Sequence, residues 1–423
     1  MEAAFVALVL FAISLPVLSR QARRENDRRV FVFLAFALAL KLACSMLRHF
    51  ISVDVYQRAD ATQYHQWGVV IAHHFRAGDF HTGLASLTST NFIRFFTGLV
   101  YTVIGPNELA GFVVFSWLGF WGLFFFYRAY IVAVPEGRKR DYRFLVFLMP
   151  SLLFWPSSIG KESWMMFSLG IATYGAAVVC AGRTLRGAGA IALGLWLALM
   201  VRPHMAGLVA VALAAAYLIR PGRRELGQLA PVAKIFALAA LVVVAVFFVS
   251  KSYAFLRESG ISTSHGLTSV LGQVTERTGA GGSEFKPSAL TSPARLPVAV
   301  VTVLFRPFIF EANNKQSLAA ALEGSFLIFL FLIRIRWVLA AVRSIRRQPY
   351  VAFAVVYVGL FLIAFSSIAN FGLLVRERTQ LYPFLFVLLT IPPRLRGGTD
   401  KALMEDVAVP TGPTYAGHRT RSR

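Results

Sequence analysis

Residues 54–80, DVYQRADATQYHQWGVVIAHHFRAGDF, form a polar and aromatic segment between two long apolar stretches. From residue 61 onward, one helical face collects Tyr64, Trp67, Gly68, Ile71 and Phe75. Such a face predicts an amphipathic helix that lies flat on a membrane surface. The apolar stretches on both sides of the segment then become the membrane-crossing helices to which it is connected.

Asp60 stands at the start of this predicted helix, three residues before Gln63. A carboxylate in the first turn of a helix interacts favourably with the helix dipole, and a carboxylate fixed at the mouth of a cavity can act as a general base. Asp is also one of the preferred N-cap residues, so the residue type leaves a structural cap and a base both open. Asp54, six residues earlier, is a second candidate for the base.

The composition is that of a polytopic membrane protein, with 57% hydrophobic residues, only 15% charged residues and 38 phenylalanines. The formal net charge is +23, but the basic residues gather in short runs between apolar segments, as the positive-inside rule expects. They can also contact the headgroups of membrane lipids. Because no basic stripe alternates with exposed aromatic residues, we predict no nucleic-acid partner. Cys44 and Cys180 lie in apolar runs and indicate no disulfide framework.

At about 18 to 20 apolar residues per crossing, the chain is predicted to be an all-α membrane protein with about 11 to 13 transmembrane helices. The predicted crossings are residues 1–19, 30–50, 109–132, 143–157, 164–181, 189–201, 204–220, 232–250, 317–335, 350–369 and 380–392. Two further apolar stretches, 92–105 and 296–310, are short and each contains an arginine. They are predicted to dip into the outer surface or to lie on it.

The basic loops set the predicted topology. Residues 1–396 form a single transmembrane domain, with the N-terminus outside. The first loop, 51–90, and a second polar segment, 251–295, face the extracytoplasmic side. Residues 397–423, rich in Gly, Pro, Thr and Arg, are predicted to be a disordered cytoplasmic tail.

Ionisable residues gather at the extracytoplasmic ends of the predicted helices. They are Asp54, Asp60, Lys161, Glu162, Arg202, His204, Arg306, Glu311, Arg376, Glu377 and Arg378. Charges beside the bilayer core are costly, so their convergence on one side indicates a site. Guanidinium groups bind phosphate oxygens in pairs, which favours a phosphorylated lipid as the ligand.

Structural roles stay open for several of these residues. Lys161 and Glu162 also fit an interfacial pair at a helix end, and Arg202 before Pro203 also fits a helix stop. The histidines His65, His73, His74 and His81 have only a loose spacing, because no two share the i, i+4 relation with a carboxylate that a tight metal site uses.

The order of four segments resembles the GT-C class of polytopic glycosyltransferases, which includes protein O-mannosyltransferase and RgtA/B/C/D-like groups. Asp60, Tyr64, Ala72 and Gly78 are similar to that family's acidic residue, surface helix and glycine. Residues 96–130, with Gly105 at the usual break, resemble its next helices. PSLLFWPSSIGKESWMMFSLG at 150–170 resembles its proline-led helix with a second acid, here Glu162, and LGLWLALMVRPHMAGLVA at 193–210 resembles its helix-Arg-Pro-helix unit.

This resemblance implies a membrane enzyme of hexosyl or pentosyl transfer. Asp60 would be the base, with Asp54 as the alternative, and Glu162 would orient a cation or the acceptor. The donor, a sugar linked to polyprenyl phosphate, would be held by Tyr64, Lys161, Arg202, His204, Arg306, Arg376 and Arg378. The acceptor would be a hydroxyl of a glycan, a lipid or a protein, in cell-envelope or extracellular polysaccharide or glycoconjugate synthesis. The expected location is the cell membrane, with the active site facing the extracytoplasmic side.

Two alternatives and one cofactor stay open. The second half, with LFRPFIFEANN at 304–314 and NFGLLVRERTQLYPFLF at 370–386, also resembles membrane proteins of polysaccharide clusters. A Wzy-like polymerase that uses oligosaccharides on lipid diphosphate is therefore the first alternative, and a lipid-linked sugar flippase or other transporter is the second. Ala61 follows Asp60 where many relatives carry a second acid, and a divalent metal stays open, with no cofactor certain.

Overall fold

The computed structural model describes residues 2–55, 60–182, 184–219, 273, 275, 278, 285, 287 and 293–393. Its regular elements are all helices, and among these described residues none forms a strand element, as the predicted all-α fold class requires. The described helices belong to one compact unit, residues 1–392. The predicted crossing at 232–250, most of the predicted loop 251–295 and the predicted tail lie outside the described residues.

Five described helices are long and apolar enough to cross a membrane. They are α1 (Glu2–Glu25), α2 (Arg28–Phe50, continued by the π-helical turn η1, Ile51–Val55), α5 (Glu108–Ala133), α8 (Lys161–Cys180) and α14 (Lys315–Ile333). Four shorter helices are also apolar: α9 (Thr184–Val201), α10 (Pro203–Ile219), α13 (Leu296–Phe305) and α16 (Pro349–Phe365). Several predicted crossings therefore coincide with apolar helices, while the number of crossings stays a prediction.

The predicted crossing 143–157 is a broken helix, and the predicted crossing 380–392 is preceded by a separate short helix. Residues 139–157 divide into α6 (Lys139–Leu148), α7 (Pro150–Phe154) and the 3-10 turn η2 (Trp155–Ser157), and residues 371–390 divide into α17 (Phe371–Arg378) and α18 (Tyr382–Thr390). The first break lies at Met149, whose backbone is extended at φ −63° and ψ 124°. The ring of the following Pro150 disfavours helical backbone at the residue before it. The apolar pattern predicted 143–157 and 380–392 as crossings, but it predicted neither the break at Met149 nor the short helix α17.

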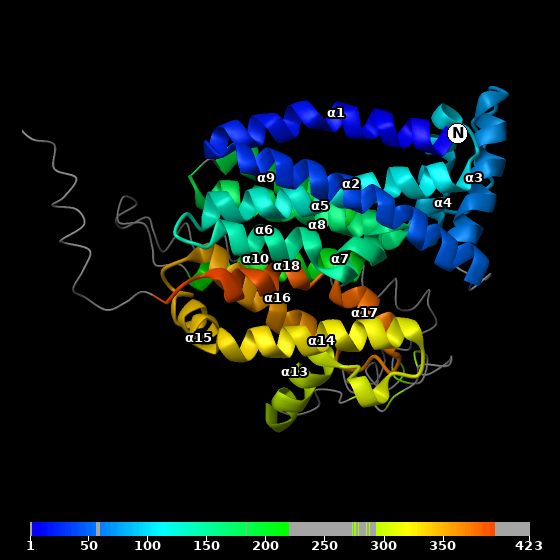
Figure 1. Ribbon diagram of the computed structural model, residues 1–423. Coiled ribbons are helices and arrows are strands. Elements are labelled where there is room, and N and C mark those ends of the chain that lie inside the picture. Colours follow the sequence, from blue (N-terminus) through cyan, green and yellow to red (C-terminus); the bar gives the residue numbers. More distant parts are fainter. Residues whose placement is uncertain are drawn as a thin grey trace, which may run out of the picture. The chain divides into compact units, whose positions relative to one another are not determined.

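The centre of the unit is built on close contacts between α5, α8 and α9 (Figure 1). A Cβ atom added at Gly122 of α5 would lie 2.4 Å from the carbonyl oxygen of Met166 in α8. A Cβ atom added at Gly194 of α9 would lie 2.5 Å from the backbone nitrogen of Ala172 in α8. Small residues therefore let the backbone of α8 approach the backbones of both α5 and α9, as in many membrane helix interfaces.

Replacing Gly122 by Val is expected to lower the free energy of unfolding by about 2 kcal/mol, because overpacking of a tight core costs about 1 to 3 kcal/mol. The clash is with backbone atoms of α8, which cannot rotate away. The unfolding midpoint of the purified protein in detergent measures the effect. Gly359→Ala in α16 is the matched control, because a Cβ atom there meets nothing within 4 Å. Equal midpoints for the two variants would contradict the tight α5–α8 contact.

Helix α3 (Asp60–Arg76) lies crosswise to the axes of α1 and α2 (Figure 1). The predicted helix over this stretch is confirmed, and Tyr64, Gly68 and Ile71 of its apolar face are buried, whereas Trp67 of the same face is exposed. The buried face packs on α4 (Ser89–Ile104), where a Cβ atom at Gly68 would meet Thr97 at 2.6 Å. Its position at a membrane surface stays a prediction.

The two short apolar stretches each form one helix. α4 covers residues 89–104 and ends at Gly105, whose φ of +94° is a left-handed conformation that suits glycine. α13 has 10 residues and ends before Arg306. At 1.5 Å per residue it is about 15 Å long, half of a hydrocarbon core of about 30 Å, and its position at the outer surface stays a prediction.

Candidate active site

A cavity of about 370 Å³ opens at the end of the unit that carries α3. Residues from α2, η1, α3, η2, the turn before α8, α8 itself, α14 and α17 line it. They are Arg48, Ser52, Asp60, Ala61, Tyr64, Trp155, Ser158, Ile159, Gly160, Glu162, Gln316 and Arg376. Four of the residues predicted from the sequence, Asp60, Tyr64, Glu162 and Arg376, are among them. Their helices are separated by up to 316 positions in the chain.

Arg376 connects the two acids of the cavity. Its Nη1 atom lies 3.2 Å from Oδ2 of Asp60, and its Nε atom lies 2.5 Å from Oε1 of Glu162. The Asp60 side chain is 64% exposed, whereas that of Glu162 is only 5% exposed. The cavity therefore has an accessible acid at its mouth and a buried acid at its base, with one guanidinium group between them.

Arg202 extends this arrangement into the interior. Its Nη2 atom donates to Oε1 of Glu162 at 2.9 Å, and its Nη1 atom donates to Oε2 of Glu377 at 2.5 Å. The side-chain amide of Gln380 also donates to Glu377, at 2.7 Å. Arg202 is buried between α9 and α10, where Pro203 begins the second helix. Both terminal nitrogens of Arg202 donate to buried carboxylates, and Arg202 does not line the cavity. Its role is therefore to support the residues behind the cavity.

Tyr64 places a hydroxyl group on the α3 side of the cavity. Burial, followed by the nearby Asp60 and Glu162 carboxylates, raises the pKa of Tyr64 to about 12. The phenol therefore keeps its proton at neutral pH. It forms a hydrogen bond with Thr90 and, as a neutral hydroxyl, can donate to an oxygen of a bound ligand.

Arg48 is a cavity residue that the sequence did not single out. Its guanidinium group lies over the rings of Phe154 and Trp155, 4.7 and 4.9 Å from their centroids. Such cation–π contacts hold the group in place. A signal was available, because Arg48 ends the apolar run 30–50 just before the polar loop, in the way that Arg202 ends its own run. Gln316 of α14 carries no comparable signal.

Arg306 and Arg378, both predicted to bind phosphate, are not among the residues that line the cavity. Arg378 is 1% exposed, and its two terminal nitrogens donate to the backbone carbonyls of Leu304 and, at 2.8 Å, Arg306. Arg306 pairs with Glu311 at 2.5 Å and lies over the rings of Phe285 and Phe371. These guanidinium groups hold the connections around α13 and α17, and their predicted contact with the donor has no support in this geometry.

Three other predicted site residues lie near the cavity without lining it. Lys161 donates to the hydroxyl of Ser89 at 3.1 Å, so it is not engaged with Glu162 in the interfacial pair considered from the sequence. His204 lies in the first turn of α10, two residues after Arg202. Asp54 is exposed on η1. Of the two candidate bases, the structure therefore brings Asp60 to the cavity and leaves Asp54 outside it.

Two histidines of the first loop, His65 and His74, contact other side chains instead of a shared ligand. Nδ1 of His65 lies 2.8 Å from the Tyr101 hydroxyl, and Nδ1 of His74 lies 2.8 Å from Asp79. Across the part of the chain that the structure describes, no group of three or more His, Cys, Asp or Glu side chains has a geometry suited to a metal ion.

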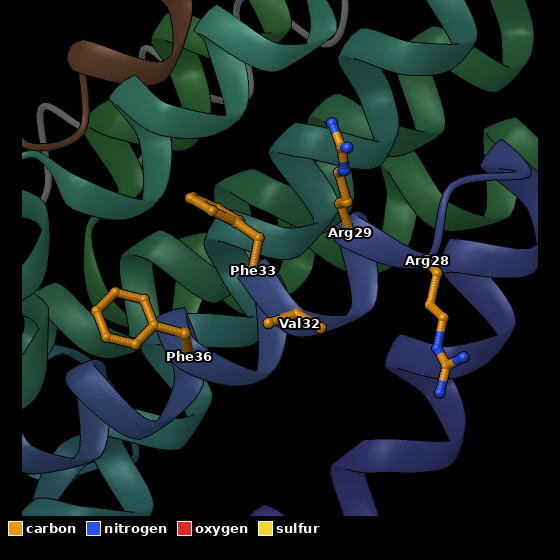
Figure 2. Close-up of a pocket in the computed structure, with 5 residues that line it drawn as sticks. All are labelled: Arg28, Arg29, Val32, Phe33 and Phe36. Atoms are coloured by element: carbon orange, nitrogen blue, oxygen red, sulfur yellow. The ribbon is translucent and has the colours of Figure 1, made fainter.

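A second hollow, of about 540 Å³, lies at the opposite end of α2 (Figure 2). Arg28, Arg29, Val32, Phe33 and Phe36 line it. In Figure 2 the side chains of Arg28 and Arg29 point in different directions, so they do not form a joint anion site. The start of α2 is about 30 Å from Arg48 at 1.5 Å per residue, too far for one sugar-phosphate group to reach both hollows.

Comparison of the chain with known protein families, with curated proteins and with solved structures finds no match.

Proposed function

We propose that the protein is a membrane glycosyltransferase that moves a sugar from a polyprenyl-phosphate donor to an acceptor hydroxyl on the extracytoplasmic face. The observation that supports it best is the meeting of Asp60, Glu162 and Arg376 in one cavity. They come from helices far apart in the sequence. An acid accessible at the mouth and a cation deeper in the same cavity are the two groups that such a transfer needs.

In the proposed reaction, Asp60 accepts the proton of the acceptor hydroxyl as that oxygen attacks the anomeric carbon of the sugar. The bond from that carbon to the phosphate oxygen breaks, and the phosphate leaves with the electron pair. Arg376 stabilises the charge that develops on the phosphate, so no acid has to protonate the leaving group. The attack and departure on opposite sides invert the anomeric centre.

The contact between Arg376 and Asp60 gives this mechanism an order of events. Nη1 of Arg376 is bonded to Oδ2 of Asp60 at 3.2 Å in the present structure. A donor phosphate that takes the place of Asp60 on this nitrogen releases the carboxylate for proton transfer. Glu162 stays on Nε of Arg376 at 2.5 Å and keeps the guanidinium group oriented.

The size of the cavity favours a single sugar over an oligosaccharide. Its volume of about 370 Å³ is near the lower end of the roughly 300 to 1,000 Å³ typical of ligand pockets. One sugar and its phosphate suit this space better than a repeat unit of several sugars. The volume therefore favours the proposed transferase over the polysaccharide polymerase that uses a lipid-diphosphate oligosaccharide.

The function is tested with the purified protein in lipid vesicles and two sets of radiolabelled donors. One set carries single sugars on polyprenyl monophosphate, and the other carries oligosaccharides on polyprenyl diphosphate. Transfer or slow hydrolysis from the first set, absent in the Asp60→Asn variant, is the expected result. Turnover of the second set alone would support the polymerase instead, and no turnover of either set would contradict the proposal.

Arg48 lines the same cavity, and in the proposed reaction its guanidinium group binds the donor phosphate together with Arg376. Replacing Arg48 by Gln is then expected to raise KM for the donor about tenfold with a smaller change in kcat, because a hydrogen bond from a charged donor to phosphate contributes about 1.5 kcal/mol or more. Arg94→Gln is the matched control. Arg94 lies over Trp67 on the outer side of α3 and does not line the cavity. The assay is donor titration at saturating acceptor. A similar KM in both variants would remove Arg48 from the donor site.

A further inference from the structure

Two buried charges on distant helices hold the ends of α7. Lys41 lies in the middle of α2 and is 1% exposed, and its Nζ atom donates to the carbonyls of Leu152 and Leu153 at 2.7 and 3.1 Å. Glu323 of α14 is also buried, and its Oε2 atom accepts a hydrogen bond from the backbone nitrogen of Ser151 at 2.6 Å. Lys41 thus meets the C-terminal end of α7 and Glu323 meets its N-terminal end.

The signs of the two charges match the polarity of the segment. Backbone N–H groups at the start of a helix attract an anion, and free carbonyls at its end attract a cation. The break at Met149 and the turn at η2 leave such groups without partners inside α7 itself. Burying an unpaired backbone N–H or carbonyl group costs free energy, and so does burying an isolated charge. Each contact between a charge and a helix end therefore offsets part of the desolvation cost of both.

The segment held in this way leads directly into the cavity. Trp155, Ser158, Ile159, Gly160 and Glu162, which follow α7 in the chain, form one wall of it. The same segment carries Phe154 and Trp155, over which the Arg48 guanidinium group lies. A shift of α7 would therefore move both the wall that contains Glu162 and the rings that hold Arg48.

We infer that Lys41 and Glu323 are positioning residues: they fix the broken helix α7 and, through it, the 155–162 wall of the cavity. Neither residue is among those that line the cavity. Their catalytic importance rests on the proposed glycosyl transfer. Their role in fixing the wall does not depend on the proposed function, and it can be measured separately.

The wall is measured by thiol labelling. In a Cys44→Ser, Cys180→Ser background, a single cysteine at Ser158 is reacted with a water-soluble methanethiosulfonate in the full-length protein. Lys41→Met is expected to speed labelling about tenfold or more, since it removes hydrogen bonds from a charged donor. Lys41→Arg, which keeps the cation, is expected to restore much of the slow labelling. A cysteine at Ser86, in an exposed loop, is the control and should react at the same rate in every variant.

A double variant tests whether the two residues act on one segment. If they do, Lys41→Met combined with Glu323→Gln labels at Ser158 about as fast as the faster single variant. Rates that multiply would mean independent effects and would overturn the inference. Unchanged labelling at Ser158 in Lys41→Met would also overturn it, whether or not the protein transfers sugar.

Donor kinetics then separate positioning from general destabilisation. Lys41→Met is expected to lower kcat and to raise donor KM, with partial rescue of both by Lys41→Arg. If labelling responds as expected but wild-type protein transfers no sugar, the proposed function fails while the fixing of α7 stands. If wild-type protein transfers sugar and Lys41→Met does so at the wild-type rate, the positioning role is wrong.

Discussion

Asp60→Asn is expected to lower kcat about a hundredfold to ten thousandfold, the usual contribution of a positioned general base. Asn has nearly the same shape as Asp but cannot take up the acceptor proton. The side chain is 64% exposed, so an acceptor hydroxyl arriving from the aqueous side can reach it. The measurement is sugar transfer at saturating donor and acceptor.

The same substitution should leave donor affinity unchanged or improve it. Asp60 occupies Nη1 of Arg376 at 3.2 Å, the nitrogen that the departing phosphate uses in the proposed mechanism. Without the Asp60 carboxylate on this nitrogen, the donor phosphate does not have to displace another anion from the Arg376 guanidinium group. A lower kcat with an equal or lower KM is therefore the signature of a base, whereas a raised KM would indicate a role in holding the donor.

Two controls accompany the Asp60 variant. Asp54→Asn changes an acid six residues away that is exposed on η1 and does not line the cavity, so it should keep wild-type activity. The unfolding free energy of Asp60→Asn should change by less than about 1 kcal/mol, because exposed ion pairs contribute little. Wild-type kcat in a folded Asp60→Asn protein would remove Asp60 from the base role.

From chain topology, the sequence predicted that Asp60, Glu162 and Arg376 gather at one end of the helices, but not which of the neighbouring charged residues line the cavity. Alternating basic loops assign the polar ends of many helices to one side, and this is enough to bring Asp60, Glu162 and Arg376 to the same end. The helical face of residues 61–75 likewise predicted which side of α3 is buried. These predictions depend on helix length, periodicity and loop charge, which a single sequence contains.

The direction of each side chain could not be predicted in the same way. Side chains two positions apart in a helix point in directions that differ by about 200°, since each residue adds a rotation of about 100° around the helix axis. Arg376 and Arg378 therefore cannot both face one cavity, and the charge pattern does not say which one does. In the structure Arg376 faces it, and Arg378 donates to backbone carbonyls around α13.

The partners of buried charged residues could not be predicted from the sequence either. Lys41 lies inside an apolar run, where a lone lysine predicts a functional or snorkelling residue equally well. Its actual partners are the carbonyls of Leu152 and Leu153, where α7 ends before Pro156, which has no N–H to donate and a non-helical backbone. Predicting this contact requires knowing both where the helix ends and which buried charge lies beside its free carbonyl groups.

Arg202→Met is expected to lower the free energy of unfolding by about 3 to 5 kcal/mol, the usual cost of removing one partner from a buried ion pair. Arg202 donates to Glu162 at 2.9 Å and to Glu377 at 2.5 Å. After the substitution Glu162 keeps Arg376, but Glu377 keeps only the neutral amide of Gln380. The measurement is the unfolding midpoint in detergent, with Arg138→Gln, which breaks a largely exposed 3.8 Å pair with Asp141, as the control.

A double variant shows whether the cost comes from the uncompensated carboxylate or from lost packing around Arg202. Arg202→Met combined with Glu377→Gln removes the cation together with the acid that depends on it. Buried ion pairs can be replaced by uncharged groups of similar volume at little cost, so the double variant should recover most of the lost stability. If it is as unstable as Arg202→Met alone, the long aliphatic stem and fork of Arg202 matter through packing, and the charge of Glu377 is not what requires an arginine there. If Arg202→Met itself unfolds at the wild-type midpoint, the charges behind the cavity contribute nothing measurable, and apolar contacts among α8, α9 and α10 hold it.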